Sequence, residues 1–139
     1  MMGITILLAD SHEAFRVELR ALINSESEMK VVAEAGDGKT AVNISKQLSP
    51  DIVITDIAMT DMNGISATRA ILEAMPQTRV IALSDYTDRI FVSGMLQAGA
   101  SGYISKDCAF EEVAKAVGAV SKGQIYLSPK IAEKAFRYG

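Results

Sequence analysis

The sequence contains few of the residues on which several classes of protein depend. Its 139 residues include one cysteine, one histidine, three prolines and no tryptophan. Because a single cysteine, Cys108, cannot form an internal disulfide and suits a reducing compartment, we expect a cytoplasmic protein. The lone histidine, His12, excludes a metal centre built from several imidazoles.

Long apolar runs and a surplus of basic charge are also missing. No apolar run approaches the length that crosses a bilayer, and no charged segment followed by an apolar one opens the chain. We therefore expect no membrane partner and no secretion. The formal net charge of −3 argues against binding of nucleic acid by the surface of this chain. The expected partners are a protein or a metal ion.

The residues that are present predict a layered fold. Hydrophobic residues make up 49% of the chain, which excludes a disordered protein, and the length fits one domain. Helix-like stretches separate five β-like apolar runs, which span residues 4–9, 30–34, 51–55, 79–83 and 102–105. The first, third and fourth runs are continuously apolar, as expected of parallel strands covered on both faces. This alternation predicts an α/β fold with a doubly wound, five-stranded parallel sheet and helices on both faces.

The last segment has a different pattern. Residues 125–129 are typical of a short extended piece, and residues 130–137 are typical of a short helix. We expect residues 1–123 to form one domain. Residues 124–139 are expected to be either an extra helix packed on that domain or a linker toward a further domain.

Polar side chains follow the apolar runs at their carboxyl ends, where parallel α/β sheets bind ligands. Asp10 and Ser11 follow the first run and Asp56 the third, while Ser84 ends the fourth and Lys106 follows the fifth. Each of these residues alone is more often a turn former or a helix cap. Together, two carboxylates, hydroxyls and an ammonium at one edge suit Mg²⁺ binding and phosphoryl transfer to a carboxylate.

Several stretches carry a resemblance to a known family. These stretches are residues 6–10, 51–59, 63–64, 80–84 and 99–106. In order, spacing and strand placement, the chain from residue 4 to about residue 122 resembles the receiver domains of two-component response regulators. Lys106, Asp107 and residues 123–129 resemble the NarL/FixJ (LuxR-type) branch, in which a helix-turn-helix DNA-binding domain follows the receiver.

The resemblance implies a flavodoxin-like fold with the strand order 2-1-3-4-5. It implies a phosphoacceptor receiver domain of a transcriptional regulator, with no enzymatic activity of its own, that takes its phosphoryl group from a sensor histidine kinase. Asp56 matches the phosphoacceptor. Asp10, Asp56 and the backbone carbonyl of Ala58 match the positions that hold Mg²⁺. DNA is expected to bind only through a further C-terminal domain, and the receiver is expected to pair as a homodimer.

The resemblance also implies how the phosphorylated state is detected. Ser84 and Lys106 match the residues that contact the phosphoryl group. Ser84 and Tyr103 match the switch pair, in which the hydroxyl moves toward the phosphoryl group and the aromatic ring turns inward.

Three positions depart from the family pattern. Ser11 stands where a second acid normally binds Mg²⁺, so its contribution as a ligand is expected to be weak or lost. Thr60 replaces a usual proline. Asp85 stands where a small residue is usual, and its carboxylate either modulates access of a phosphodonor or replaces part of the missing negative charge. Two mechanisms follow: ordinary phosphorylation with weak Mg²⁺ binding, or an atypical receiver acting as a phosphorylation-independent interaction module. The intact acceptor, switch hydroxyl and lysine favour the first.

Other functions fit the sequence less well. Residues 36–40, Gly-Asp-Gly-Lys-Thr, resemble part of a nucleotide-binding loop, but Ala33 stands where that motif needs a glycine. An ordinary turn before a helix is the favoured interpretation of this segment. A flavin carrier of the same fold would need a phosphate-cradling loop after the first strand, where residues 10–13 are too acidic.

Overall fold

A six-stranded parallel sheet organises the chain. The computed structural model describes residues 3–137. The strands are β1 (Ile4–Ala9), β2 (Met29–Ala35), β3 (Ile52–Thr55), β4 (Arg79–Ser84), β5 (Gly102–Ser105) and β6 (Tyr126–Leu127). Their order is β2-β1-β3-β4-β5-β6, and each neighbouring pair is parallel. The predicted order 2-1-3-4-5 is therefore confirmed, and one more strand extends the sheet beyond β5.

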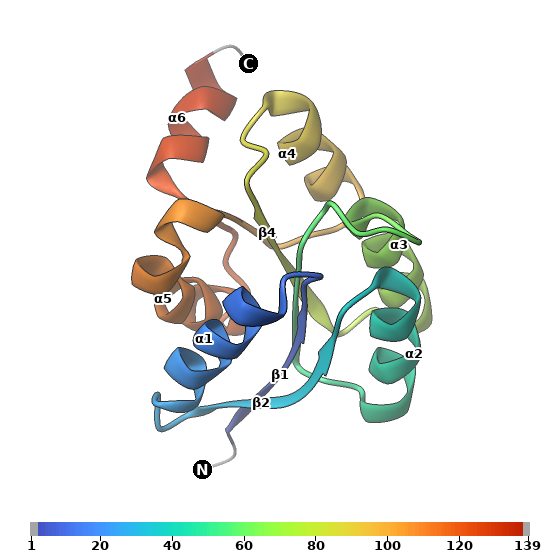
Figure 1. The fold of residues 1–139 in the computed structure, drawn as a ribbon. Coiled ribbons are helices and arrows are strands. Elements are labelled where there is room, and N and C mark those ends of the chain that lie inside the picture. Colours follow the sequence, from blue (N-terminus) through green and yellow to red (C-terminus); the bar gives the residue numbers. More distant parts are fainter. Residues whose placement is uncertain (1–2, 138–139) are drawn as a thin grey trace.

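Helices cover both faces of this sheet (Figure 1). They are α1 (Glu13–Asn24), α2 (Gly38–Leu48), α3 (Gly64–Ala74), α4 (Arg89–Gln97), α5 (Ala109–Ser121) and α6 (Pro129–Arg137), with a 3₁₀ turn, η1 (Lys106–Cys108), before α5. Helices α1 and α5 lie together on one face, whereas α2, α3 and α4 follow one another on the other. None of the described helices is both long enough and apolar enough to span a bilayer.

The alternation of side chains along the central strands divides the core into two clusters. Leu7 and Val53 face the cluster under α2, α3 and α4, whereas Ile6 and Ile54 face the cluster under α1 and α5. All four side chains are fully buried. Because both faces of each strand need apolar residues, these strands have the continuous apolar runs seen in the sequence rather than an alternating pattern.

Residues 124–137 belong to the same folded unit. Strand β6 pairs with β5, in the register Gly102 with Tyr126 and Tyr103 with Leu127. The following helix, α6, contacts α4 and β5, and its Ile131 is fully buried in the cluster beneath α4. The expectation of an extra packed helix agrees with this arrangement. The boundary at residue 123 and a further domain after residue 139 stay predictions, and residues 138–139 lie outside the described residues.

The turn after β3 depends on one close approach of the backbone. Asn63 caps α3 by accepting a hydrogen bond from the Ser66 N–H at 2.9 Å, and the Gly64 N–H donates to the Ile57 carbonyl at 2.9 Å. A Cβ atom on Gly64 would lie 2.3 Å from the backbone oxygen of Asp56. Glycine at position 64 therefore lets α3 start directly against the end of β3.

Candidate functional site

Strand register brings the polar strand-end residues to one edge. Ala9 of β1 is paired with Thr55 of β3, so Asp10 and Asp56 leave the sheet at the same level. Ser84 of β4 is paired with Ser105 of β5, and Lys106 follows directly. The edge contains the carboxyl ends of four neighbouring strands, where ligands of such sheets bind.

Lys106 joins the two carboxylates. Its Nζ lies 2.8 Å from Asp10 Oδ2 and 3.2 Å from Asp56 Oδ2. The side chains of Asp10, Asp56 and Lys106 are 1%, 3% and 9% exposed, so all three charges are nearly removed from water. One cation does not balance two anions, and the cluster keeps an excess negative charge that a further cation would neutralise.

The surroundings shift the pKa values of this cluster. Burial raises the pKa of Asp56; the positive charge of Lys106 opposes this shift, and the neighbouring carboxylate of Asp10 adds to it. Burial alone would lower the pKa of Lys106, but the two carboxylates outweigh it and raise that pKa. Lys106 is therefore held in its charged form between the two acids.

Side chains from two helices and a neighbouring strand hold this cluster in place. Arg16 of α1 donates to the Asp10 backbone carbonyl at 2.6 Å and to Glu34 Oε1 of β2 at 2.9 Å. The Lys106 ammonium also lies 4.9 Å from the centre of the Phe15 ring, a cation–π distance. Phe15 in turn meets the edge of Phe110 of α5, with ring centres 5.5 Å apart.

Of the two predicted switch residues, Ser84 is the last residue of β4 and Tyr103 lies within β5. The fully buried Ser84 accepts a hydrogen bond from the Tyr86 N–H at 2.9 Å. Tyr103 is also fully buried, and its hydroxyl donates to the Tyr86 carbonyl. Burial raises the pKa of Tyr103 to about 12, so its hydroxyl stays protonated and can donate a hydrogen bond at neutral pH. Tyr103 thus already lies inside the protein in this structure, and its movement on phosphorylation stays a prediction.

The remaining predicted positions lie nearer the surface. Ser11, Ala58 and Asp85 are exposed, and the Ala58 N–H donates to Asp56 Oδ1 at 3.3 Å. Asp85 is exposed and directly follows the buried Ser84 at the end of β4. The roles of Ala58 as a metal ligand and of Asp85 in access stay predictions.

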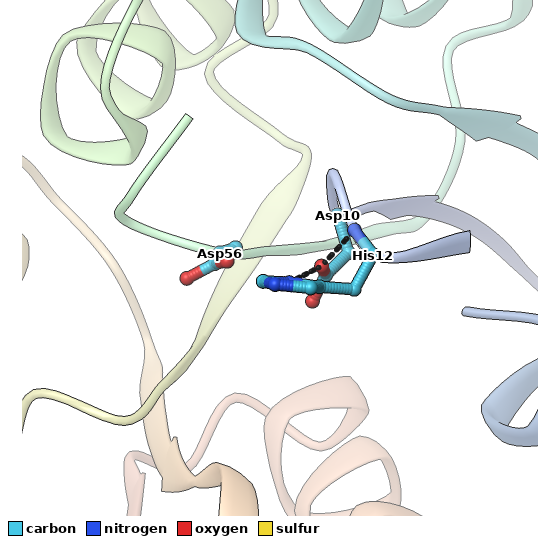
Figure 2. A group of neighbouring side chains, drawn as sticks. All are labelled: Asp10, His12 and Asp56. Carbon is cyan, nitrogen blue, oxygen red and sulfur yellow. Dashed lines mark hydrogen bonds and ion pairs between the residues drawn. The ribbon is translucent and has the colours of Figure 1, made fainter. Parts of the chain in front are cut away.

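The predicted site did not include His12, which lies beside the Asp10 carboxylate. Its backbone N–H donates to Asp10 Oδ1 at 2.8 Å, and its ring Nδ1 lies 3.3 Å from the same oxygen. Figure 2 shows the imidazole beside the Asp10 carboxylate, on the side that faces Asp56. Its place in the sequence could have indicated this contact. A residue two positions after an aspartate can donate its backbone N–H to that carboxylate, and its side chain then lies close to the same carboxylate.

The donor set fits a divalent cation. Asp10, His12 and Asp56 each offer one ligand atom, and these atoms lie within 4.8 Å of one another. Asp10 Oδ2 is buried and forms its ion pair with Lys106 without the geometry of a hydrogen bond. The carboxylate oxygens are ligands that Mg²⁺ accepts.

The segment at residues 36–40 is the start of α2 and not a phosphate-binding loop. Asp61 accepts hydrogen bonds from the Gly38 N–H at 2.9 Å and the Lys39 N–H at 3.0 Å, and Asp37 accepts one from the Thr40 N–H at 2.8 Å. Because carboxylates occupy the N–H groups that a phosphate would need, the favoured interpretation of a turn before a helix agrees with the structure.

Comparison with known proteins identifies the family. Residues 6–118 match the response regulator receiver domain. The chain belongs to this family. It is 35% identical over 128 residues to the transcriptional regulatory protein DegU of Brevibacillus brevis, and 36% identical over 131 residues to the transcriptional regulatory protein LiaR of Bacillus subtilis (strain 168). These matches cover 92% and 94% of the chain but 54% and 62% of the two relatives, so the chain spans little more than half of their length.

Solved structures support the same assignment. The crystal structure of a LuxR-family two-component response regulator from Aurantimonas sp. SI85-9A1 superimposes with a TM-score of 0.94 at 32% identity, covering 98% of this chain and 97% of that one. The signal receiver domain of the response regulator NarL from Mycobacterium tuberculosis gives a TM-score of 0.84 at 29% identity, covering 89% and 100%. The predicted resemblance to the LuxR-type branch and the predicted fold class are confirmed.

Proposed function

We propose that Asp56 of this receiver accepts a phosphoryl group from the phosphohistidine of a sensor kinase. The observation that carries the proposal is the buried bridge from Lys106 to both Asp10 and Asp56. It joins an acceptor carboxylate, a second acid and a cation at the carboxyl edge of the sheet. Nothing in the described residues or in the comparisons favours the atypical, phosphorylation-independent alternative.

The proposed reaction needs little from the protein beyond placement and charge. A carboxylate oxygen of Asp56 forms a bond to phosphorus, while the bond from phosphorus to the donor imidazole breaks and that imidazole takes up a proton. Lys106 then donates from Nζ to the new phosphoryl oxygens instead of to the Asp56 carboxylate. The Ser84 hydroxyl is the second proposed donor, and the exposed Asp85 that follows it is proposed to modulate entry to the edge.

Asp10, Asp56 and the Ala58 carbonyl are the groups that would hold Mg²⁺, with Ser11 as a weak ligand at most. Bound Mg²⁺ supplies positive charge that neutralises the phosphoryl oxygens during transfer. We expect weak binding, because serine offers a neutral hydroxyl where a carboxylate would supply a full negative charge.

The proposed partners are those expected of a receiver of this branch. We propose that phosphorylation acts through the buried Ser84 and Tyr103 to bias the surface around α4 and β5, and that a symmetric homodimer forms in response. The relatives DegU and LiaR are transcriptional regulators. We propose the same role for this receiver in the cytoplasm, with DNA bound through a further C-terminal domain.

Intact mass spectrometry tests the acceptor. The chain is incubated with a small acyl phosphate and excess Mg²⁺, beside the Asp56→Asn variant and a sample with chelator. We expect the mass of one phosphoryl group to be added to the native chain alone. Equal labelling of the Asn variant would move the acceptor elsewhere, and no labelling at any Mg²⁺ concentration would contradict the proposed function.

A further inference from the structure

Next to the position of the missing acid, the turn after β1 brings an imidazole against the Asp10 carboxylate. Ser11, which stands at the position of the missing acid, is exposed. The next residue, His12, returns toward the site, because its N–H is bonded to Asp10 Oδ1 and its ring lies against the same carboxylate (Figure 2). Its side chain is 70% exposed, so the imidazole can be reached from solvent while the carboxylates beneath it are buried.

The geometry allows the ring to share a cation with both acids. Nitrogen and oxygen ligands lie about 2.0–2.2 Å from Zn²⁺, so ligand atoms on opposite sides of one ion are roughly 4.0–4.4 Å apart. The ligand atoms of Asp10, His12 and Asp56 lie within 4.8 Å of one another. The His12 side chain is 70% exposed, so its ring has room to turn toward the two carboxylates. The contact of 3.3 Å between His12 Nδ1 and Asp10 Oδ1 is long for a hydrogen bond, so replacing it loses little.

The chemistry of the three ligands separates classes of metal. Mg²⁺ is a hard cation that prefers oxygen ligands and gains little from a neutral nitrogen. Imidazole nitrogen suits Zn²⁺, Co²⁺ and Ni²⁺, and mixed nitrogen and oxygen ligands bind these ions more tightly than all-oxygen sets do. Loss of the acid at position 11 therefore weakens the site for Mg²⁺, and the neighbouring His12 imidazole strengthens it for transition-metal dications.

We propose that His12 is a third metal ligand, with Asp10 and Asp56, and that this site binds a first-row transition-metal dication in preference to Mg²⁺. The inference rests on the same site as the proposed phosphorylation of Asp56 but not on phosphoryl transfer. Metal binding is measured directly, without a phosphodonor, so either proposal can fail while the other holds.

The test compares binding of Co²⁺, Zn²⁺ and Mg²⁺ to the untagged chain, in which His12 is the single histidine. Isothermal titration gives the affinities, and the visible absorption spectrum of bound Co²⁺ reports nitrogen ligation. The variants are His12→Ala and Ser11→Asp. We expect His12→Ala to weaken Co²⁺ and Zn²⁺ binding by about tenfold or more, to change the Co²⁺ spectrum, and to leave Mg²⁺ binding within about twofold of the native value. We expect Ser11→Asp to strengthen Mg²⁺ binding by about tenfold.

A second measurement guards against misfolding. Circular dichroism and thermal unfolding of His12→Ala should match those of the native chain, because the ring is largely exposed. In nitrogen-15 spectra of the native chain, paramagnetic Co²⁺ should shift or broaden the imidazole signals of His12 at one equivalent. The proposal is overturned if those signals are unaffected, if His12→Ala binds Co²⁺ as the native chain does, or if the native chain binds Mg²⁺ more tightly than Co²⁺.

Discussion

Asp56 is a buried carboxyl group whose surroundings work against its negative charge. Burial and the neighbouring Asp10 raise its pKa, and Lys106 compensates only in part. The proposed phosphoacceptor thus carries a cost in stability, because its carboxylate is charged while it is buried. Such costs are common where a side chain is placed for chemistry rather than for packing.

This cost predicts a pH dependence. Because the pKa of Asp56 in the folded chain lies above its ordinary value of 3.8, the folded chain binds more protons than the unfolded chain between these two values. The contribution of Asp56 to the free energy of unfolding therefore falls as pH rises through that window. Asp56→Asn, which is neutral at every pH, should remove this contribution and be more stable than the native chain at pH 7. Urea unfolding from pH 4 to pH 7 measures the difference, and an Asn variant that is less stable at pH 7 would contradict the assignment.

A second residue-scale prediction concerns Gly64, which lies against the backbone of Asp56. A Cβ on Gly64 would overlap the Asp56 backbone oxygen, so Gly64→Ala should destabilise the chain by roughly 1–3 kcal/mol and displace the acceptor. The matched control is Gly118→Ala in α5, where a Cβ meets nothing within 4 Å. That control should stabilise the chain by about 0.5–1 kcal/mol, because alanine favours the helix. Equal effects of the two changes on thermal unfolding would disprove the steric argument.

At the scale of the element, β6 and α6 are tied to the segment that carries the proposed phosphate contact. Ser128 donates from its N–H to the Tyr103 carbonyl at 3.0 Å and accepts from the Ser105 N–H at 3.2 Å. Lys130 of α6 pairs with Asp107 at 2.7 Å. These contacts lie on both sides of Lys106 in the sequence, so α6 is positioned to respond to changes at the end of β5.

Ile131 anchors this element. Its side chain is fully buried in the core cluster beneath α4, so Ile131→Ala should lower the free energy of unfolding by about 3 kcal/mol. Ile125, which is 69% exposed, provides the matched control, and Ile125→Ala should change stability by less than about 0.5 kcal/mol. Urea unfolding monitored by circular dichroism distinguishes the two. A loss at Ile131 no larger than at Ile125 would show that α6 does not pack as described.

At the scale of the whole molecule, one sheet carries both core clusters. Side chains that alternate along β1 and β3 face opposite clusters, so neither helical layer can separate without exposing the same strands. Strand β6 and helix α6 join this arrangement through β5 and the cluster beneath α4.

The chain should therefore unfold as one cooperative unit. In urea, far-ultraviolet circular dichroism and tyrosine fluorescence should give the same midpoint, since Tyr103 and the strands lose their environment together. The free energy of unfolding should fall by about 1–3 kcal/mol per molar urea. Separate midpoints for the two signals would show that α6 and the β5 edge unfold independently of the rest.

The sequence by itself determined the fold class, the order of strands and helices, and the polar residues at the carboxyl ends of the strands. Burial on both faces of a strand requires a continuous apolar run, and the chain becomes polar where each strand leaves the core. Both features can therefore be recognised from short stretches of sequence. They were enough to identify Asp10, Asp56, Ser84 and Lys106 as neighbours at one edge.

Only the tertiary structure decided which side chains meet there. Lys106 contacts Asp10 and Asp56 from distant parts of the chain, and that contact depends on the parallel register of β1, β3 and β5. The contact of His12 with the Asp10 carboxylate depends on the geometry of the turn after β1. The sixth strand forms because the edge of β5 is open to pairing with residues 126–127. Such contacts join residues through the folded sheet and through side-chain rotamers, which local periodicity does not encode.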